Sequence, residues 1–440
     1  MVSHSHRYDT LIIGAGAAGL AAAKELQTAG QQVLILEARD RIGGRVWSDY
    51  GLATHPVELG AEFVHGEVVT RDLAATYGLR LQPVLADDRG YVHSETGLQT
   101  IADYTQGEAA IARDVMQSNE SAIWEWADSW VRQGKPDTDV ATLVKAQGIE
   151  IPAPVQQIVS HTYSADYGVY WDQLGVHGLV ESTYEGDGCA EYRLVEGYGE
   201  LFDRWARDLK IALNHAIARI DWRSPDYVEV TTTDGLRFQA DRVVITLPLA
   251  ILQREIVEFL PALPDWKQQA INGLGSSSII KLILKFDRPF WPADWEHCHT
   301  HLSSQLWWRP GFGAADEAPI VTAFVGAAGA EWLRSLGELG AINVGLAHLA
   351  NIFTIEEQIL RDRFVSGKLV DWCADPYSQM GYSYTPVGGT GLRAQLAQAI
   401  DDRLYFAGEA TSVLRPATVH GAIATGIASA HQILAGLNFN

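Results

Sequence analysis

A glycine-rich turn between two apolar runs constrains the fold of this chain more than any other feature. Gly14, Gly16 and Gly19 lie in the turn, and Glu37 closes the second apolar run. Gly14 permits the tight turn, Gly16 lets the backbone approach a pyrophosphate, and Gly19 allows the helix to pack closely on the strand. The site predicted is one for the ADP half of a dinucleotide, with Glu37 accepting hydrogen bonds from a ribose. The elements expected are a strand, a helix and a second strand over residues 10–13, 17–29 and 32–36.

The residues directly after this acid supply further groups for phosphate. Glycine backbone N–H groups and guanidinium forks both suit phosphate oxygens. A nicotinamide enzyme does not need such a second phosphate-contacting loop. The residues concerned are Ala38, Arg39, Gly43, Gly44 and Arg45.

A second segment carries a resemblance to a known family. Residues 58–66 have the sequence ELGAEFVHG, and they include Gly60, Ala61 and Glu62. Together with residues 38–45, this run resembles the flavin-containing amine oxidase family. That family includes monoamine oxidases, polyamine oxidases, L-amino acid oxidases and the flavin histone demethylases. The resemblance implies FAD as the cofactor, with Ala17 and Ala18 at the start of the helix also in contact with it.

The C-terminal part of the chain strengthens the resemblance. Residues 403–411 and 417–426 are typical of a strand, a glycine turn and a helix rich in small residues. In the family, an equivalent helix has its N-terminus near the flavin and stabilises negative charge on the reduced ring. The resemblance therefore assigns Gly408, Glu409, Thr418 and Val419 to the cofactor site.

A single FAD site assembled from both ends of the chain implies a discontinuous domain. We expect an α/β fold with a Rossmann-like FAD-binding domain and a second, α+β substrate domain of amine-oxidase type. A chain of 440 residues, 47% of them hydrophobic, can fill two cores. The boundaries expected are 1–80, 195–285 and 376–440 for the FAD-binding domain, and 81–194 and 286–375 for the substrate domain.

Between these parts of the chain, one stretch has a hydrophobic pattern typical of helices and another has a pattern typical of strands. Apolar positions from 103 to 131, including Ile111 and Val115, recur at helical spacing and predict a helical insertion. A further helix is expected near residues 154–163. The hydrophobic pattern then becomes typical of strands, which are expected over residues 211–220, 227–232, 237–245 and 278–286.

Lys281 lies among apolar residues in the last of these strands. Taken alone, such a lysine is most often a strand-end charge that reaches solvent. The resemblance gives it another role, because Lys281 matches the lysine that holds a water near flavin N5. Lys285, on the same strand, is expected to be solvated.

An aromatic pair follows further along the chain. The resemblance places Trp372 and Tyr382 beside the isoalloxazine, where two π faces can enclose an amine and exclude water. Monoamine oxidases carry a cysteine that bonds the flavin, and this chain has Met380 and Gly381 at that point. FAD is therefore expected to bind without a covalent link.

Two residues point toward polyamines within the family. Thr418 replaces the second aromatic of the monoamine-oxidase cage, and His65 resembles the polyamine-oxidase version of its motif. The alternative for His65 is a loop histidine bonded to backbone. Glu62 and Glu191 are further acids considered as contacts for a polycationic substrate.

Composition limits the partners and the compartment. The net charge of −21 argues against nucleic acid and anionic membranes. Cys189, Cys298 and Cys373 give neither a disulfide framework nor a metal-ligand spacing, so no metal is expected. No signal peptide or apolar span is seen, and we expect a soluble, cytoplasmic monomer or homodimer with no membrane partner.

The reaction expected is oxidation of a small cationic amine by FAD, with dioxygen reduced to hydrogen peroxide. Catalytic roles are implied for Lys281, Trp372, Tyr382, His65 and Thr418. Polyamine oxidase is the first of four hypotheses. An L-amino acid oxidase would need an arginine fork for the carboxylate, such as Arg309 or Arg193. The others are a carotenoid-desaturase-like flavoprotein, which needs an apolar membrane-docking patch, and a flavin-bearing module without turnover.

Overall fold

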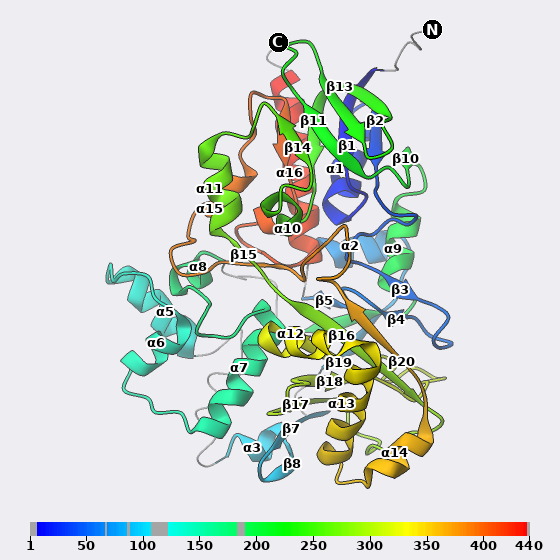
Figure 1. The fold of residues 1–440 in the computed structure, drawn as a ribbon, viewed down its shortest axis with the longest axis vertical. Coiled ribbons are helices and arrows are strands. Elements are labelled where there is room, and N and C mark those ends of the chain that lie inside the picture. The colour runs from blue at the N-terminus through cyan, green and yellow to red at the C-terminus, as the bar shows by residue number, and fades with distance from the viewer. Residues whose placement is uncertain (1–6, 67, 86–88, 107–121, 183–189, 438–440) are drawn as a thin grey trace.

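The computed structural model describes residues 7–66, 68–85, 89–106, 122–182 and 190–437. The molecule is elongated, with one β-sheet in its upper part and another in its lower part (Figure 1). β1 (Arg7–Ile13) and α16 (Val419–Leu437) both lie in the upper part, so segments from the two ends of the chain are built into one body.

The first sheet is the nucleotide-binding layer that the glycine motif predicts. β1 pairs in parallel with β2 (Val33–Leu36), and α1 (Ala17–Thr28) connects them. The predicted strand, helix and strand are thus confirmed. Across the sheet the order is β10 (Ile211–Ala212), β2, β1, β13 (Arg237–Ile245), β12 (Val228–Thr232), β11 (Ile217–Asp221) and β14 (Glu258–Leu260), and β22 (Leu404–Phe406) pairs with β13.

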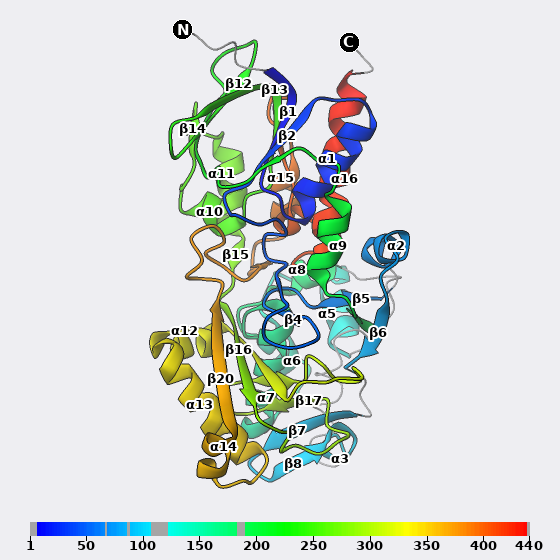
Figure 2. The same ribbon diagram turned by 90° about the vertical axis from the view of Figure 1, so that its right-hand side faces the viewer.

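Both faces of this sheet are buried, because side chains alternate along β1. Ile12 packs into the core that α1 and α16 share, whereas Leu11 and Ile13 pack into the core on the opposite face. Figure 2 shows α1 and α16 side by side on one side of the sheet. The opposite face is covered by α10 (Leu249–Gln253), α11 (Asp265–Gly273) and α15 (Leu392–Ala397).

One predicted strand is wrong, and the difference shapes the site. The strand expected over residues 211–220 is broken into β10 and β11. Between them, Asn214 N–H donates to Arg39 O at 2.9 Å and His215 N–H donates to Glu37 O at 2.7 Å. The chain leaves the sheet because its backbone pairs with the loop after β2 instead.

The second sheet lies below the first and belongs to the middle of the chain. Its order is β20 (Phe364–Asp371), β16 (Ile279–Phe286), β19 (Ile320–Gly326), β18 (Leu306–Trp308), β17 (His297–Thr300), β7 (Gly90–Ser94) and β8 (Gly97–Thr100). An apolar core joins β16 and β19 to α13 (Gly337–Ile352) and to α12 (Ala327–Ser335) and α14 (Glu357–Arg363). β16 therefore lies in this sheet, although residues up to 285 were expected in the FAD-binding domain. The domain boundaries themselves stay a prediction.

Further helices complete both parts of the molecule. The predicted helix near residues 154–163 is α7 (Ala153–Tyr167), and Gly168, with φ +75°, ends it. Of the predicted helical insertion, α3 (Ile101–Tyr104) and α5 (Ala122–Arg132) are found, while Ile111 and Val115 lie outside the described residues. The remaining helices are α2 (Val69–Thr76), α6 (Val140–Ala146), α8 (Val176–Glu181), α9 (Tyr198–Trp205) and the 3-10 turn η3 (Glu409–Thr411).

Short sheets link these layers. β9 (Glu191–Leu194) pairs with β5 (Phe63–His65) and β6 (Leu81–Val84). The other short pairs are β3 (Ser48–Asp49) with β4 (Val57–Glu58), and β15 (Gly275–Ser276) with β21 (Ser383–Tyr384). Within the described ranges, no helix has both the length and the apolar character that crossing a bilayer requires.

Candidate functional site

A cavity of about 1210 Å³ runs from the glycine turn of the first sheet to the helices of the lower part. This is larger than the roughly 300–1,000 Å³ of most small-molecule sites. Segments from the beginning, middle and end of the chain line it. Of the predicted site residues, those that line the cavity are Gly14, Gly16, Ala17, Ala18, Glu37, Ala38, Arg39, Gly43, Gly44, Arg45, Gly60, Ala61, Glu62, His65, Lys281, Trp372, Tyr382, Gly408, Glu409, Thr418 and Val419.

The glycines of the first turn have distinct environments. Gly14 has φ +103°, which few other residues adopt. A Cβ added to Gly16 would meet no atom within 4 Å, so a side chain there would extend into open space. A Cβ on Gly19 would lie 2.0 Å from Gly14 O. Gly19 is absent from the cavity wall, and its contact is the close packing of helix on strand.

Glu37 is held at the end of β2 by backbone donors. Its Oε2 accepts the Ala15 N–H at 2.7 Å, and its Oε1 accepts the Arg39 N–H at 2.9 Å. The side chain is nearly buried yet lines the cavity. A carboxylate with two fixed donors keeps further lone pairs for ribose hydroxyls, as the sequence predicts.

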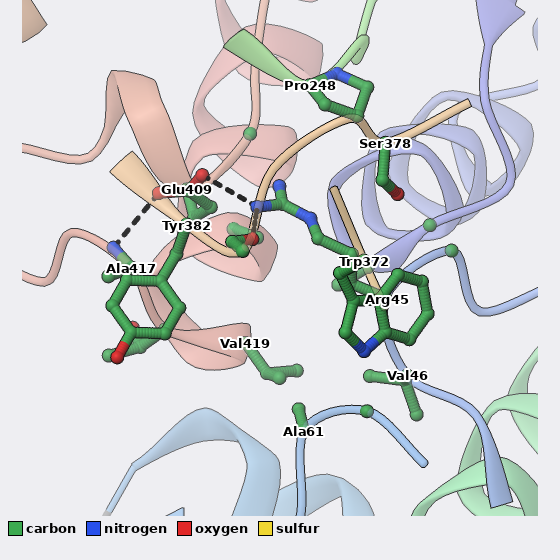
Figure 3. Close-up of a pocket in the computed structure, with 18 of the residues that line it drawn as sticks. Arg45, Val46, Ala61, Pro248, Trp372, Ser378, Tyr382, Glu409, Ala417 and Val419 are labelled. Carbon is green, nitrogen blue, oxygen red and sulfur yellow. Dashed lines mark hydrogen bonds and ion pairs between the residues drawn. The ribbon is translucent and has the colours of Figure 1, made fainter. Parts of the chain in front are cut away.

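Two of the arginines after Glu37, Arg39 and Arg45, also tie distant parts of the chain together. Arg39 pairs with Asp375 and donates to Ser378 Oγ at 3.0 Å. Arg45 donates to Gly381 O at 2.6 Å and to Glu409 Oε1 at 3.0 Å, and Figure 3 shows this contact. Both guanidinium groups therefore have protein partners in addition to the phosphates predicted for them.

Glu409 anchors the entry to the last helix. It accepts a hydrogen bond from Ser383 Oγ at 2.6 Å. It also accepts one from the Ala417 N–H at 3.1 Å (Figure 3). Burial raises the pKa of Glu409, but the charges of Arg45 and Arg393 outweigh burial and hold it below its usual range. The carboxylate is thus ionised and bound on several sides.

The N-terminus of α16 opens toward the cavity. Val419 and Ala422 of its first turn line the wall. Thr418 Oγ1 accepts the Gly421 N–H at 3.0 Å and donates to Arg415 O at 2.9 Å. The helix start therefore presents its positive dipole end to whatever occupies the cavity.

Lys281 is buried in the cavity wall, with 2% of its side chain exposed. Its Nζ donates to Glu58 O and to Glu62 Oε2, at 2.9 Å each. Lys285 was expected in solvent, and this prediction is wrong. It is half-buried and donates to Leu52 O at 2.7 Å, because its strand packs against residues 52–53.

Trp372 and Tyr382 both lie among the side chains around the cavity in Figure 3. The Trp372 indole donates to Leu59 O at 3.0 Å, and the Tyr382 hydroxyl donates to Ala165 O at 2.6 Å. Each ring is held through its polar end, so its apolar face is available to the cavity. Met380 is turned away, with Sδ accepting the Ala250 N–H at 3.2 Å, and no cysteine is present among the described lining residues.

The lower end of the cavity carries acids. His65 Nδ1 lies 2.9 Å from Glu191 Oε1, so the histidine is bonded to the side chain of an acid. Asp166, at the end of α7, is open to the cavity although protein surrounds it. Burial raises the pKa of Asp166 to about 7, the Glu191 charge adds to the rise, and His65 opposes it.

Sequence reasoning missed three acids of this end. Asp166, Glu125 and Asp128 line the cavity, the latter two from α5. Helical periodicity brings Trp124 and Asp128 to one face, so the spacing held a partial signal. No motif marks Asp166.

Other predicted groups are committed to internal partners. Glu62 was considered as an acid for a polycation, but its carboxylate is bound to Lys281, Arg193 and Trp308. Arg193 therefore provides no free fork for a substrate carboxylate. Arg309 makes a two-point contact with Glu317, at 2.7 Å for each pair of atoms.

The lining fits a dinucleotide with a ring system at its inner end. Gly16 leaves room beside the N-terminus of α1, and Glu37, Trp372 and Lys281 line the same cavity. Three or more His, Cys, Asp or Glu side chains arranged for a metal ion are not found in the described part of the chain.

Comparison with known proteins gives three findings. A family model described as flavin containing amine oxidoreductase matches residues 17–434. Lysine-specific histone demethylase 1B of Mus musculus is 28% identical over 98% of this chain and 53% of its own length. Polyamine oxidase 4 of Oryza sativa subsp. japonica is 29% identical over 96% of this chain and 88% of its own length. The chain thus spans about half the length of the demethylase.

A solved structure of putrescine oxidase bound to putrescine superposes with a TM-score of 0.83 at 20% identity. The match covers 98% of this chain and 99% of that one. At such identity the likeness establishes the fold alone, and it confirms the predicted α/β fold class.

Proposed function

Because this chain belongs to the flavin-containing amine oxidoreductase family, with FAD as its cofactor, we propose that it oxidises a polyamine at a carbon–nitrogen bond. The substrate loses two electrons and two protons, and the resulting imine is hydrolysed to an aldehyde and an amine. Dioxygen takes up both electrons and both protons and leaves as hydrogen peroxide. Spermidine and spermine represent the proposed substrate class.

The acids at the lower end of the cavity carry this proposal. Asp166 on α7 and Glu191 on β9 line the same cavity as Lys281 and Trp372. Carboxylates in such a position attract cations and hold ammonium groups away from the reacting nitrogen. A substrate with several amines can meet both ends of the site at once, whereas a monoamine cannot.

The residues of the inner end prepare the reacting amine. When bound, FAD accepts a hydride from the carbon next to the amine nitrogen. Trp372 and Tyr382 supply apolar walls that exclude water and so favour the neutral amine. Lys281 is proposed to hold a water with the N–H that its two protein partners leave available.

An L-amino acid oxidase is the alternative from the same family. It needs a guanidinium fork for the substrate carboxylate, and both arginines considered for that role are paired with glutamates. An apolar lipid substrate is disfavoured because acids line the lower end. A module without turnover is disfavoured because buried charge and aromatic rings surround the cavity.

A peroxide-coupled screen tests the proposal. Spermidine, spermine, putrescine, monoamines and L-amino acids are compared at equal concentration. We expect the highest kcat/KM with a polyamine. Peroxide formed from L-amino acids but from none of the polyamines would contradict the proposal.

Variants of the acids sharpen that screen. Asp166→Asn and Glu191→Gln should each lower kcat/KM for spermidine by roughly tenfold, equivalent to about 1.4 kcal/mol. Activity with a monoamine should change little. Asp172→Asn is the matched control, because Asp172 is exposed shortly after α7 and does not line the cavity.

A further inference from the structure

The Glu62 carboxylate is the centre of a buried ionic cluster. Its Oε2 accepts from Lys281 Nζ at 2.9 Å, and its Oε1 accepts from Arg193 Nε at 3.0 Å. The second guanidinium nitrogen, Arg193 Nη2, lies 2.8 Å from the same Oε1. Trp308 Nε1 lies 3.1 and 3.2 Å from the two oxygens. Both carboxylate oxygens are therefore fixed by at least two donors.

The cluster gives the Lys281 ammonium one defined position. Its Nζ donates to Glu62 and to the backbone oxygen of Glu58, and it lies 5.1 Å from the centre of the Trp308 ring. These partners come from the segment before β5 and from β18, whereas Lys281 is on β16 and Arg193 on β9. Four separate segments thus meet at one wall of the cavity.

The charges of the cluster do not cancel. Lys281 and Arg193 are two cations that share one buried carboxylate. Burial raises the pKa of Glu62, but those two charges outweigh burial and hold it below its usual range. Glu58 is also nearby. Burial raises the pKa of its carboxyl to about 7, the Lys281 charge opposes that rise, and its two oxygens accept from Ser48 Oγ and from the Tyr198 N–H, at 2.7 Å each.

We infer that Glu62 is a positioning residue whose carboxylate, itself held by Arg193 and Trp308, keeps the Lys281 ammonium charged and fixed at the cavity wall. Without this anion, two buried cations face each other, and Lys281 is the one that can lose its proton. The consequence for bound flavin rests on the proposed function, which puts Lys281 beside the reactive edge of the ring.

The first test measures thermal stability against pH and does not depend on activity. In Glu62→Gln, the folded protein should release the Lys281 proton more readily than the unfolded chain does, because burial without a counter-ion disfavours the ammonium. The unfolded chain then binds more protons than the folded one, so stability rises with pH until the unfolded lysine also titrates. We expect an unfolding midpoint roughly 3–5 °C below wild type at pH 7, recovering toward pH 10.

Two further proteins identify the group responsible. The double variant Glu62→Gln with Lys281→Met should lose the alkaline recovery, because the titrating amine is gone. Glu317→Gln is the matched control, since it breaks a second, partly buried glutamate–arginine pair outside the cavity wall. It should destabilise without alkaline recovery, because arginine stays charged.

The second test follows the absorption spectrum of bound FAD over the same pH range without substrate. Glu62→Gln should show a titration that wild type and the double variant lack. Alkaline recovery of stability without a spectral titration would keep the role of Glu62 and reject the placement of Lys281 beside the flavin.

A stability of Glu62→Gln that follows wild type at every pH would overturn the inference. If Glu62→Gln does not fold, the stability of the double variant tests the inference instead, because removing Lys281 relieves its repulsion with Arg193. A double variant no more stable than Glu62→Gln would then contradict the inference.

Discussion

The two ends of the cavity are built in different ways. At the nucleotide end, the contacts come from backbone and from residues close together in sequence, mainly the first turn and Glu37 with the loop after it. At the amine end, side chains on β5, α5, α7 and β9 converge from distant parts of the chain. The nucleotide end can therefore be recognised from a sequence motif. The amine end is formed by isolated acids that the fold brings together.

The difference has a functional reading. A dinucleotide is the same in every member of a family, so a rigid backbone cradle suffices for it. An amine is selected by charge and shape, and exchanging single side chains on separate elements can change both. We therefore expect substitutions at the nucleotide end to affect FAD binding and those at the amine end to affect substrate choice.

The largest effect is expected at Gly16. Gly16→Val should fold, because its Cβ points into open space, but its side chain would occupy the place of the pyrophosphate. We expect the Kd for FAD to rise by at least about 100-fold, measured by fluorescence titration of the apoprotein.

Gly19→Val is the companion variant. Its Cβ would meet the Gly14 carbonyl at 2.0 Å, so the helix must move and the apoprotein itself should lose stability. Equal thermal unfolding of the two apo variants would show that the distinction between cradle and packing is wrong.

Lys281→Met tests the part of the cavity around Lys281 and Trp372, between the nucleotide end and the amine end. FAD should remain bound, while flavin reduction by amine or reoxidation by dioxygen should slow by roughly 100-fold, as seen by stopped-flow absorption. Lys285→Met is the control, since Lys285 is on the same strand but donates to Leu52 and does not line the cavity. Unchanged rates of flavin reduction and reoxidation in Lys281→Met would contradict the role proposed for Lys281.

The pH dependence should differ between the ends. Glu409 is held ionised by Arg45 and Arg393, so FAD affinity should vary little between pH 6 and 8. Asp166 has a pKa near 7 and binds an ammonium group only when ionised, so kcat/KM for spermidine should rise with pH through that value, by about tenfold.

Asp166→Asn should flatten the limb of the profile near pH 7 and leave the limb that reports deprotonation of the amine itself. A profile identical to wild type would exclude Asp166 as the titrating group.

The smallest effect is expected at Thr418, which lies at the start of α16. Thr418→Ala removes the oxygen that accepts the Gly421 N–H, and loss of such a cap costs about 1 kcal/mol. The unfolding midpoint should fall by roughly 1 °C with FAD still bound. Thr418→Ser keeps the oxygen and should match wild type. A larger loss in the serine variant would point to packing of the methyl group instead.

The sequence predicted the strands, the turn and the helix around Gly14, Gly16 and Glu37, because these residues follow one another at a spacing that only local geometry determines. It also placed Lys281 and Trp372 on the wall of one cavity, and for these the resemblance was needed. It failed where partners are distant. The break between β10 and β11 depends on backbone bonds to the loop after β2, and the environment of Lys285 depends on residue 52.

Asp166 shows the limit of sequence reasoning most clearly. Nothing in its neighbourhood along the chain distinguishes it from other surface acids. Its raised pKa arises from burial and from Glu191, which is on strand β9 and pairs with His65. Such a group becomes recognisable only when the elements are assembled.

The most direct measurement is anaerobic addition of spermidine to the FAD-loaded protein, followed by absorption spectroscopy. If one cavity holds FAD at its nucleotide end and a polyamine at its amine end, the yellow colour of the oxidised flavin should bleach. The colour should return, with formation of hydrogen peroxide, when air is admitted. A protein that binds FAD and stays yellow with every amine offered would contradict this assignment.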